Sequence, residues 1–125
     1  MYRYDWILHQ IQMLVRFIAR LIWNKDTIEY QIAEHNNLSE TDLLYFEIEE
    51  LLAHYKICEA ENLLHERLDK NNNKYLELAI DFYLKLNNMS DEALENADFS
   101  REEIESGLKE VTRIFGLPYF NLQET

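Results

Sequence analysis

The sequence contains few of the residues that break helices or cross-link small folds. Among its 125 residues are two glycines, one proline and one cysteine. So little glycine and proline excludes collagen-like chains, flexible linkers and turn-rich β-sandwiches. The single cysteine, Cys58, excludes an internal disulfide, and no basic segment leads into a clean apolar run with a cleavage site, so we expect a cytoplasmic protein. The composition predicts one all-α domain over residues 1–125, long enough to bury a sizeable core.

Positive charge is also scarce. The chain has 12 lysines and arginines against 24 aspartates and glutamates, a formal net charge of -12. Such an excess repels phosphate groups, so we do not expect nucleic acid as a partner. The charge is uneven, because residues 1–25 carry four basic side chains and one acidic one, a local +3 that leaves -15 for the other hundred residues. One end of the chain is therefore basic and the rest is acidic.

Residues 1–23 are predicted to form an apolar helix with one narrow polar stripe. The stripe residues recur at spacings of three and four: Asp5, His9, Gln12, Arg16 and Arg20. Apolar side chains occupy most of the remaining girth, so the helix must be covered by its own domain or by another chain. The short apolar run and its two arginines exclude a membrane-spanning helix. We predict a homo-oligomer or another protein partner that buries part of five side chains: Trp6, Phe17, Ile18, Leu21 and Trp23.

After this helix the chain divides into an arm, a body and a tail. Residues 24–40 are predicted to form an extended arm, in which three apolar residues alternate with polar ones: Ile28, Tyr30 and Ile32. Residues 41–116 show apolar residues at helical spacing and form the body, which we expect to consist of αα-hairpins packed around its most apolar helix, from Lys74 to Asn88. Residues 117–125 form an apolar tail.

Serines mark the starts of helices in the body. Ser39 with Asp42, and Ser100 with Glu103, have the spacing of capping boxes, and Ser90 is placed to cap a short helix. These serines are therefore interpreted as helix caps rather than nucleophiles.

The last helix contains a glycine among apolar residues. Gly107 stands in mid-helix, where glycine costs about 1 kcal/mol relative to alanine. Either another backbone approaches closely at this position, or the glycine is simply tolerated.

No arrangement of residues indicates catalysis, a metal or a cofactor. The spacing of His54, Cys58, Glu61 and His65 would place them on one side of an unbroken helix, but a turn expected at Lys56 interrupts it. The sequence has no glycine-rich phosphate loop and no second histidine of a metalloprotease helix. We therefore expect a protein that is not an enzyme.

The helix pattern resembles a tetratricopeptide repeat in part. Leu44, Leu51, Ala60 and Leu64 occupy repeat-like packing positions, and Ala93 follows Ala60 by 33 residues. The pattern departs from the repeat because Ile48 stands where a small residue belongs and Asn72 where proline belongs. This weak resemblance implies stacked helix pairs.

Over nearly its whole length the chain resembles a family of short, acidic, all-helical Firmicutes proteins of unknown function. Three stretches carry the resemblance: Asp5-Trp6 with the segment from Met13 to Arg20, the segment from Tyr75 to Ala79, and the segment from Asp98 to Ile104. The resemblance implies a helical fold and a bacterial, cytoplasmic origin, and it implies no activity.

Three functions remain open at this point. The first is a non-enzymatic interaction or oligomerisation module that uses the first helix. The second is a binding protein for an anionic small molecule, with a pocket in the helical core and Arg16 or Arg20 as the ligand-binding residue. The third is peripheral membrane attachment through the first helix, which its narrow polar face disfavours. Arg16 and Arg20 are expected either to be exposed or to pair with Glu77 and Asp81, which share their spacing of four residues.

Overall fold

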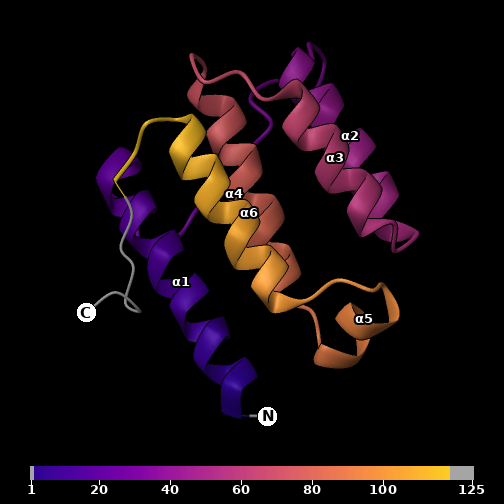
Figure 1. The fold of residues 1–125 in the computed structure, drawn as a ribbon. Coiled ribbons are helices and arrows are strands. Elements are labelled where there is room, and N and C mark those ends of the chain that lie inside the picture. Colours follow the sequence, from indigo (N-terminus) through magenta and orange to yellow (C-terminus); the bar gives the residue numbers. More distant parts are fainter. Residues whose placement is uncertain (1, 119–125) are drawn as a thin grey trace.

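The computed structural model describes residues 2–118, with side chains described from Trp6 onward. Within that range the chain forms six helices and no strand, which confirms the all-α class (Figure 1). The helices are α1 (Tyr2–Trp23), α2 (Glu40–Ala53), α3 (Ile57–Arg67), α4 (Asn73–Asn87), α5 (Asp91–Asn96) and α6 (Arg101–Ile114).

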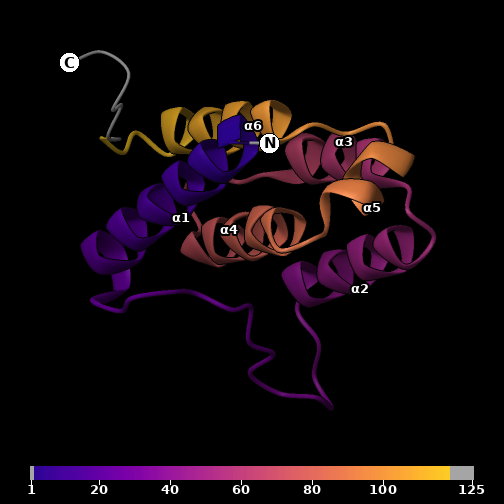
Figure 2. The same cartoon turned by 90° about the horizontal axis from the view of Figure 1, so that it is seen from below.

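Helix α4 is the centre of the fold. It packs against α1, α2 and α6, while α3 pairs with α2 and α1 also contacts α6 (Figures 1 and 2). The nearly continuous apolar sequence of this helix predicts the central place, and nine of its residues are buried, including Asp81 and Asn87. The α2–α3 pair is an αα-hairpin, but Ala93 lies in the six-residue α5 and not in a second full hairpin, so the tetratricopeptide resemblance is not established.

The predicted serine caps are confirmed. Ser39 and Ser100 each form a complete capping box, with Asp42 and Glu103 as the respective partners. The Ser90 side chain accepts a hydrogen bond from the backbone N–H of Ala93 at the start of α5. Each cap satisfies backbone donors that the first turn of a helix leaves unpaired, and so fixes where the helix begins.

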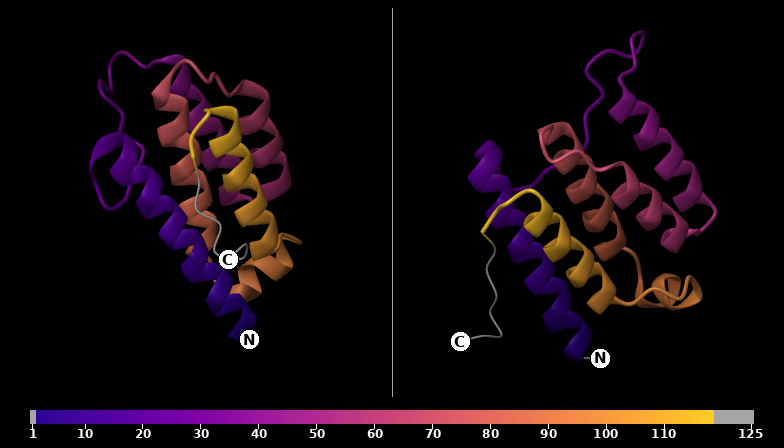
Figure 3. Two further views of the ribbon diagram at one scale, coloured as in Figure 1. Left: turned by 60° about the vertical axis from the view of Figure 1, so that its left-hand side comes forward. Right: turned by 45° about the horizontal axis from the view of Figure 1, so that its top comes forward.

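The arm between α1 and α2 lies at the end of the molecule opposite the N-terminus (Figure 3). Ile28 and Tyr30 are buried in the chain's own core, while Glu29 between them is exposed, as the alternation predicts. Two backbone N–H groups of the arm donate to carboxylates of α4, Tyr30 to Asp81 Oδ1 at 3.1 Å and Gln31 to Glu77 Oε2 at 2.9 Å. The polar side of α4 therefore holds the arm in place.

The atoms that leave no room for a larger residue at Gly107 belong to side chains and not to a backbone. A Cβ atom at this position would lie 2.3 Å from the Tyr83 hydroxyl oxygen and 2.6 Å from Glu61 Oε2. The hypothesis that another backbone approaches closely is therefore wrong, because the approaching group is the hydroxyl end of Tyr83 from α4.

Candidate functional site

Helix α1 exposes four large apolar side chains on one side. Met13, Phe17 and Leu21 follow each other at intervals of four residues, and Trp6 lies seven residues before Met13, so the four side chains share one stripe. Their exposed fractions are 47% for Trp6, 50% for Met13, 39% for Phe17 and 50% for Leu21. We refer to these four residues as the α1 stripe. Met13 was not among the interface residues expected from the sequence, although its spacing from Phe17 indicates the same face.

Two of the expected interface residues belong to the chain's own core. Ile18 is fully buried on the core side of α1, with Ile11 and Leu14 beside it in the same cluster. It is therefore not available to a partner, which corrects the sequence expectation. Trp23 is half-buried and packs against the core from the end of α1. The sequence does not separate the buried face of α1 from its exposed apolar face, because both consist of apolar residues.

The arginines of α1 border the α1 stripe. Arg16 and Arg20 are exposed, and Arg20 forms an ion pair with Asp26 at 2.5 Å. Among the described side chains, Arg16 has no hydrogen bond or ion pair. The alternative pairing with α4 within this chain is not found, because Glu77 pairs with Lys74 and Asp81 with Lys85 instead.

A second exposed apolar surface lies on α2. Leu43 and Phe46 are 53% and 46% exposed. With Leu51 and the carboxylates Glu47 and Glu50 they line a groove of about 600 Å³, which we call the α2 groove. This groove was not predicted from the sequence. The signal was the three-residue spacing of Leu43 and Phe46, which places both on one side of α2.

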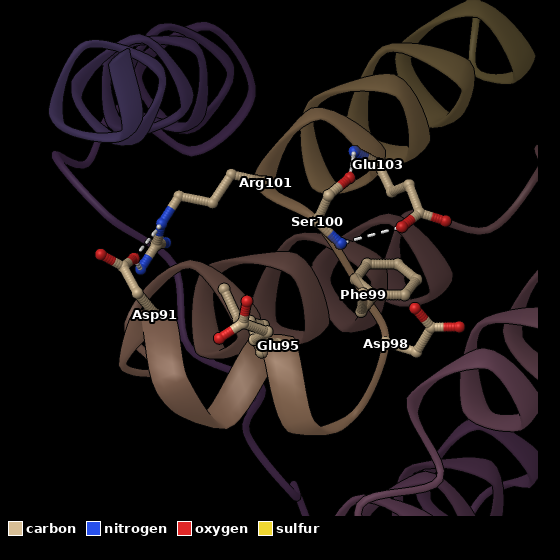
Figure 4. A pocket seen from close by; sticks show the side chains of 8 residues that line it. Asp91, Glu95, Asp98, Phe99, Ser100, Arg101 and Glu103 are labelled. Atoms are coloured by element: carbon tan, nitrogen blue, oxygen red, sulfur yellow. Dashed lines mark hydrogen bonds and ion pairs between the residues drawn. The ribbon is translucent and has the colours of Figure 1, made fainter. Parts of the chain in front are cut away.

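A pocket of about 290 Å³ lies between α5 and the start of α6 (Figure 4). Its one cation, Arg101, is 4% exposed and already saturated: the guanidinium donates to the backbone carbonyls of Asn87 and Met89 and to Asp91. The Ser100 and Glu103 side chains are engaged in the capping box. These groups hold α4, α5 and α6 together, so the pocket offers a ligand little beyond exposed carboxylates.

Tyr83 lies at the centre of a hydrogen-bonded cluster beneath a shallow hollow of about 360 Å³. Its hydroxyl donates to Glu61 Oε2 at 2.6 Å and lies 2.7 Å from His65 Nε2. Burial, and then the hydrogen bond to Glu61, raise the pKa of Tyr83 far above its ordinary value of 10.0. The phenol therefore stays protonated at physiological pH and acts as a structural donor between α3 and α4.

The four metal-ligand candidates are not brought together. His54 lies in the turn after α2 and contacts Glu50, whereas Cys58 and His65 are on α3. Within the described part of the chain, no group of three or more His, Cys, Asp and Glu side chains is arranged to hold a metal ion. Burial, followed by the nearby carboxylates of Glu103 and Glu61, raises the pKa of the Cys58 thiol, which makes it a weak nucleophile.

Comparisons with known proteins place the chain in a family without assigning an activity. Among the described helices, none is both long and apolar enough to cross a membrane. Searches of curated proteins and of solved structures gave no match. A family model matches residues 1–116. The chain therefore belongs to a family of unknown function (DUF6483), whose extent agrees with the resemblance seen in the sequence.

Proposed function

We propose that this protein is a non-enzymatic, cytoplasmic interaction module whose α1 stripe binds a protein partner, in the first place a second copy of the same chain. The observation that carries the proposal is the exposure of Trp6, Met13, Phe17 and Leu21 on one side of α1. Single exposed apolar side chains are ordinary on protein surfaces. Four on one side of a helix form an apolar stripe, and the largest apolar patch of a protein surface is often functional.

The size of the stripe sets what the partner must supply. Covering its exposed area, on the order of 400 Å², gives about 10 kcal/mol of hydrophobic free energy before costs. Association itself costs roughly 4–15 kcal/mol in lost translational and rotational freedom. The stripe alone is therefore insufficient, and a partner must also complement the charged residues at its border.

The two alternative functions have less support. Four pockets lined by residues between Leu43 and Glu110 do not include Arg16 or Arg20, so an anionic small molecule bound in one of them would not contact these side chains. Membrane attachment would use the same stripe and arginines. Such attachment is opposed by electrostatic repulsion between anionic lipid and the strong negative charge of the rest of the chain.

The proposal is tested by replacing the centre of the stripe with polar residues of similar size. The Phe17→Gln/Leu21→Gln variant keeps good helix formers and leaves the core unchanged. We expect sedimentation equilibrium at micromolar concentration to show self-association of the wild type and monomers of this variant, with the same circular dichroism. Leu38→Gln is the matched control, because Leu38 is an exposed leucine of the arm, outside the stripe.

Two results contradict the proposal. One is a wild-type protein that stays monomeric across the concentration range and captures no protein through α1. The other is a Phe17→Gln/Leu21→Gln variant that associates as strongly as the wild type. Binding of the monomer to phosphatidylglycerol vesicles, lost in the same variant, would assign the stripe to membrane attachment instead.

A further inference from the structure

The α2 groove has the shape and polarity to receive an apolar helix face. Leu43 and Phe46 project from α2 on the side away from its core residues Leu44 and Ile48, which are 1% exposed. Glu47 and Glu50 line the same groove. The groove therefore combines exposed apolar side chains with two carboxylates.

The border of the α1 stripe carries the opposite charge, on Arg16 and Arg20. Arg16 and Arg20 are four residues apart beside Phe17, and Glu47 and Glu50 are three residues apart beside Phe46. Each pair covers about one helical turn, so two helices packed side by side can bring both pairs opposite each other. Unlike charges around an apolar centre are the usual arrangement of a specific protein interface.

The carboxylates of the α2 groove are only weakly engaged within their own chain. Glu47 Oε1 lies 3.9 Å from Arg67 Nη1, and Glu50 Oε2 lies 3.6 Å from His54 Nδ1. All four side chains are at least half exposed. Exposed pairs at such distances contribute little free energy, so they can be exchanged for arginines of a partner at small cost.

We propose that the α1 stripe of one copy docks into the α2 groove of a second copy, with Phe17 and Leu21 against Leu43 and Phe46. This inference rests on the proposed function, because it names the binding partner of the same stripe. The alternative, in which the stripe packs on the stripe of a second copy, gathers four arginine side chains at one interface. Like charges in contact oppose association, whereas the α2 groove neutralises them.

Each molecule presents both surfaces at the same time. Helices α1 and α2 both pack on α4 and flank it (Figure 2). Contact between two different surfaces is heterologous, so it extends into a ring or a chain, or closes as a reciprocal pair in which both contacts form at once.

A charge exchange between the two surfaces tests the inference. The first variant is Arg16→Glu/Arg20→Glu and the second is Glu47→Lys/Glu50→Lys. In each variant alone the two surfaces have the same charge, so we expect self-association in sedimentation velocity to weaken at least roughly tenfold. An equimolar mixture restores unlike charges at every contact, so mixed oligomers should form with at least wild-type affinity, and two different tags identify them.

A matched control separates this effect from net charge. Glu92→Lys/Glu95→Lys changes the total charge equally, with the same three-residue spacing on exposed positions of α5. This control is expected to associate like the wild type and not to rescue Arg16→Glu/Arg20→Glu. Circular dichroism verifies that every variant is folded.

The outcomes distinguish failure of the inference from failure of the proposed function. If Glu47→Lys/Glu50→Lys associates like the wild type while Phe17→Gln/Leu21→Gln is monomeric, the stripe binds elsewhere and only the inference is wrong. If the mixture fails to restore association, or if the control rescues equally well, the inference is also wrong. A wild type that does not self-associate overturns the inference, and one that also captures no protein through α1 overturns the proposed function as well.

Discussion

Replacing Gly107 by alanine tests how tightly α4 and α6 are packed. The new Cβ would lie 2.3 Å from the Tyr83 hydroxyl oxygen and 2.5 Å from Tyr83 Cζ. Because Tyr83 is fully buried, its ring cannot swing into solvent and must displace its neighbours. Overpacking of this kind costs typically about 1–3 kcal/mol, and weakening the hydrogen bond to Glu61 adds about 1 kcal/mol. The gain in helix propensity returns about 1 kcal/mol.

We therefore expect Gly107→Ala to lower the free energy of unfolding by about 1–3 kcal/mol, measured by urea denaturation. For a chain of this size that corresponds to a fall in Tm of roughly 3–15 °C. The neighbouring Ser106→Ala, at an exposed position of α6, should be neutral or slightly stabilising.

The same substitution in a Tyr83→Leu protein tests whether the Tyr83 side chain is the cause. In a Tyr83→Leu protein the phenol is gone, so Gly107→Ala should cost much less than in the wild type, or should stabilise the protein through its helix propensity alone. If the Gly107→Ala variant is as stable as the wild-type protein, the close approach of Tyr83 does not require glycine at position 107. Equal destabilisation in both backgrounds would show that the cause lies elsewhere in α6.

Two further predictions concern buried polar groups. Burial opposes ionisation of Asp42, but hydrogen bonds from Tyr30 and Ser39 lower the pKa of its carboxyl group below the ordinary value of 3.8. The ionised carboxylate therefore stabilises the fold above pH 3.8, and this stabilisation is lost as the pH falls through the pKa of the folded state. We expect Asp42→Asn to cost about 1–3 kcal/mol in urea denaturation at pH 7 and less near pH 3; an equal cost at both values would contradict this. Arg101→Met leaves the buried carbonyl of Asn87 without its donor, and we expect a loss of about 2–3 kcal/mol together with faster amide hydrogen exchange in α5. Unchanged exchange there would show that Arg101 does not hold α5.

The local features of the fold were predictable from single side chains. Ser39, Ser90 and Ser100 cap helices because a hydroxyl can accept from a backbone N–H two or three residues later, whatever surrounds it. The alternation of Ile28 and Tyr30 likewise indicated a half-buried arm, and both are buried. Such signals depend on neighbours along the chain, which the sequence contains.

The hydrogen-bond and ion-pair partners of the charged residues were not predictable in the same way. Arg16 and Arg20 share a spacing with Glu77 and Asp81, but the carboxylates of α4 instead accept from the arm and from Lys74 and Lys85. Several partners satisfy the same spacing rule, and only the packing of α1 on α4 selects among them. Arg101 was missed for the same reason, because its acceptors lie on residues 87–91 and no local pattern marks them.

The sequence by itself determined the helical class, the helix starts and the unusually apolar character of α1, since these follow from composition, capping and periodicity. Only the tertiary structure decided which apolar residues of α1 enter the core and which remain outside. Ile18 and Phe17 are adjacent and equally apolar, yet one is fully buried and the other 39% exposed. The difference arises because α4 and α6 cover one side of α1, and the direction from which they do so is set by contacts between residues far apart in the chain.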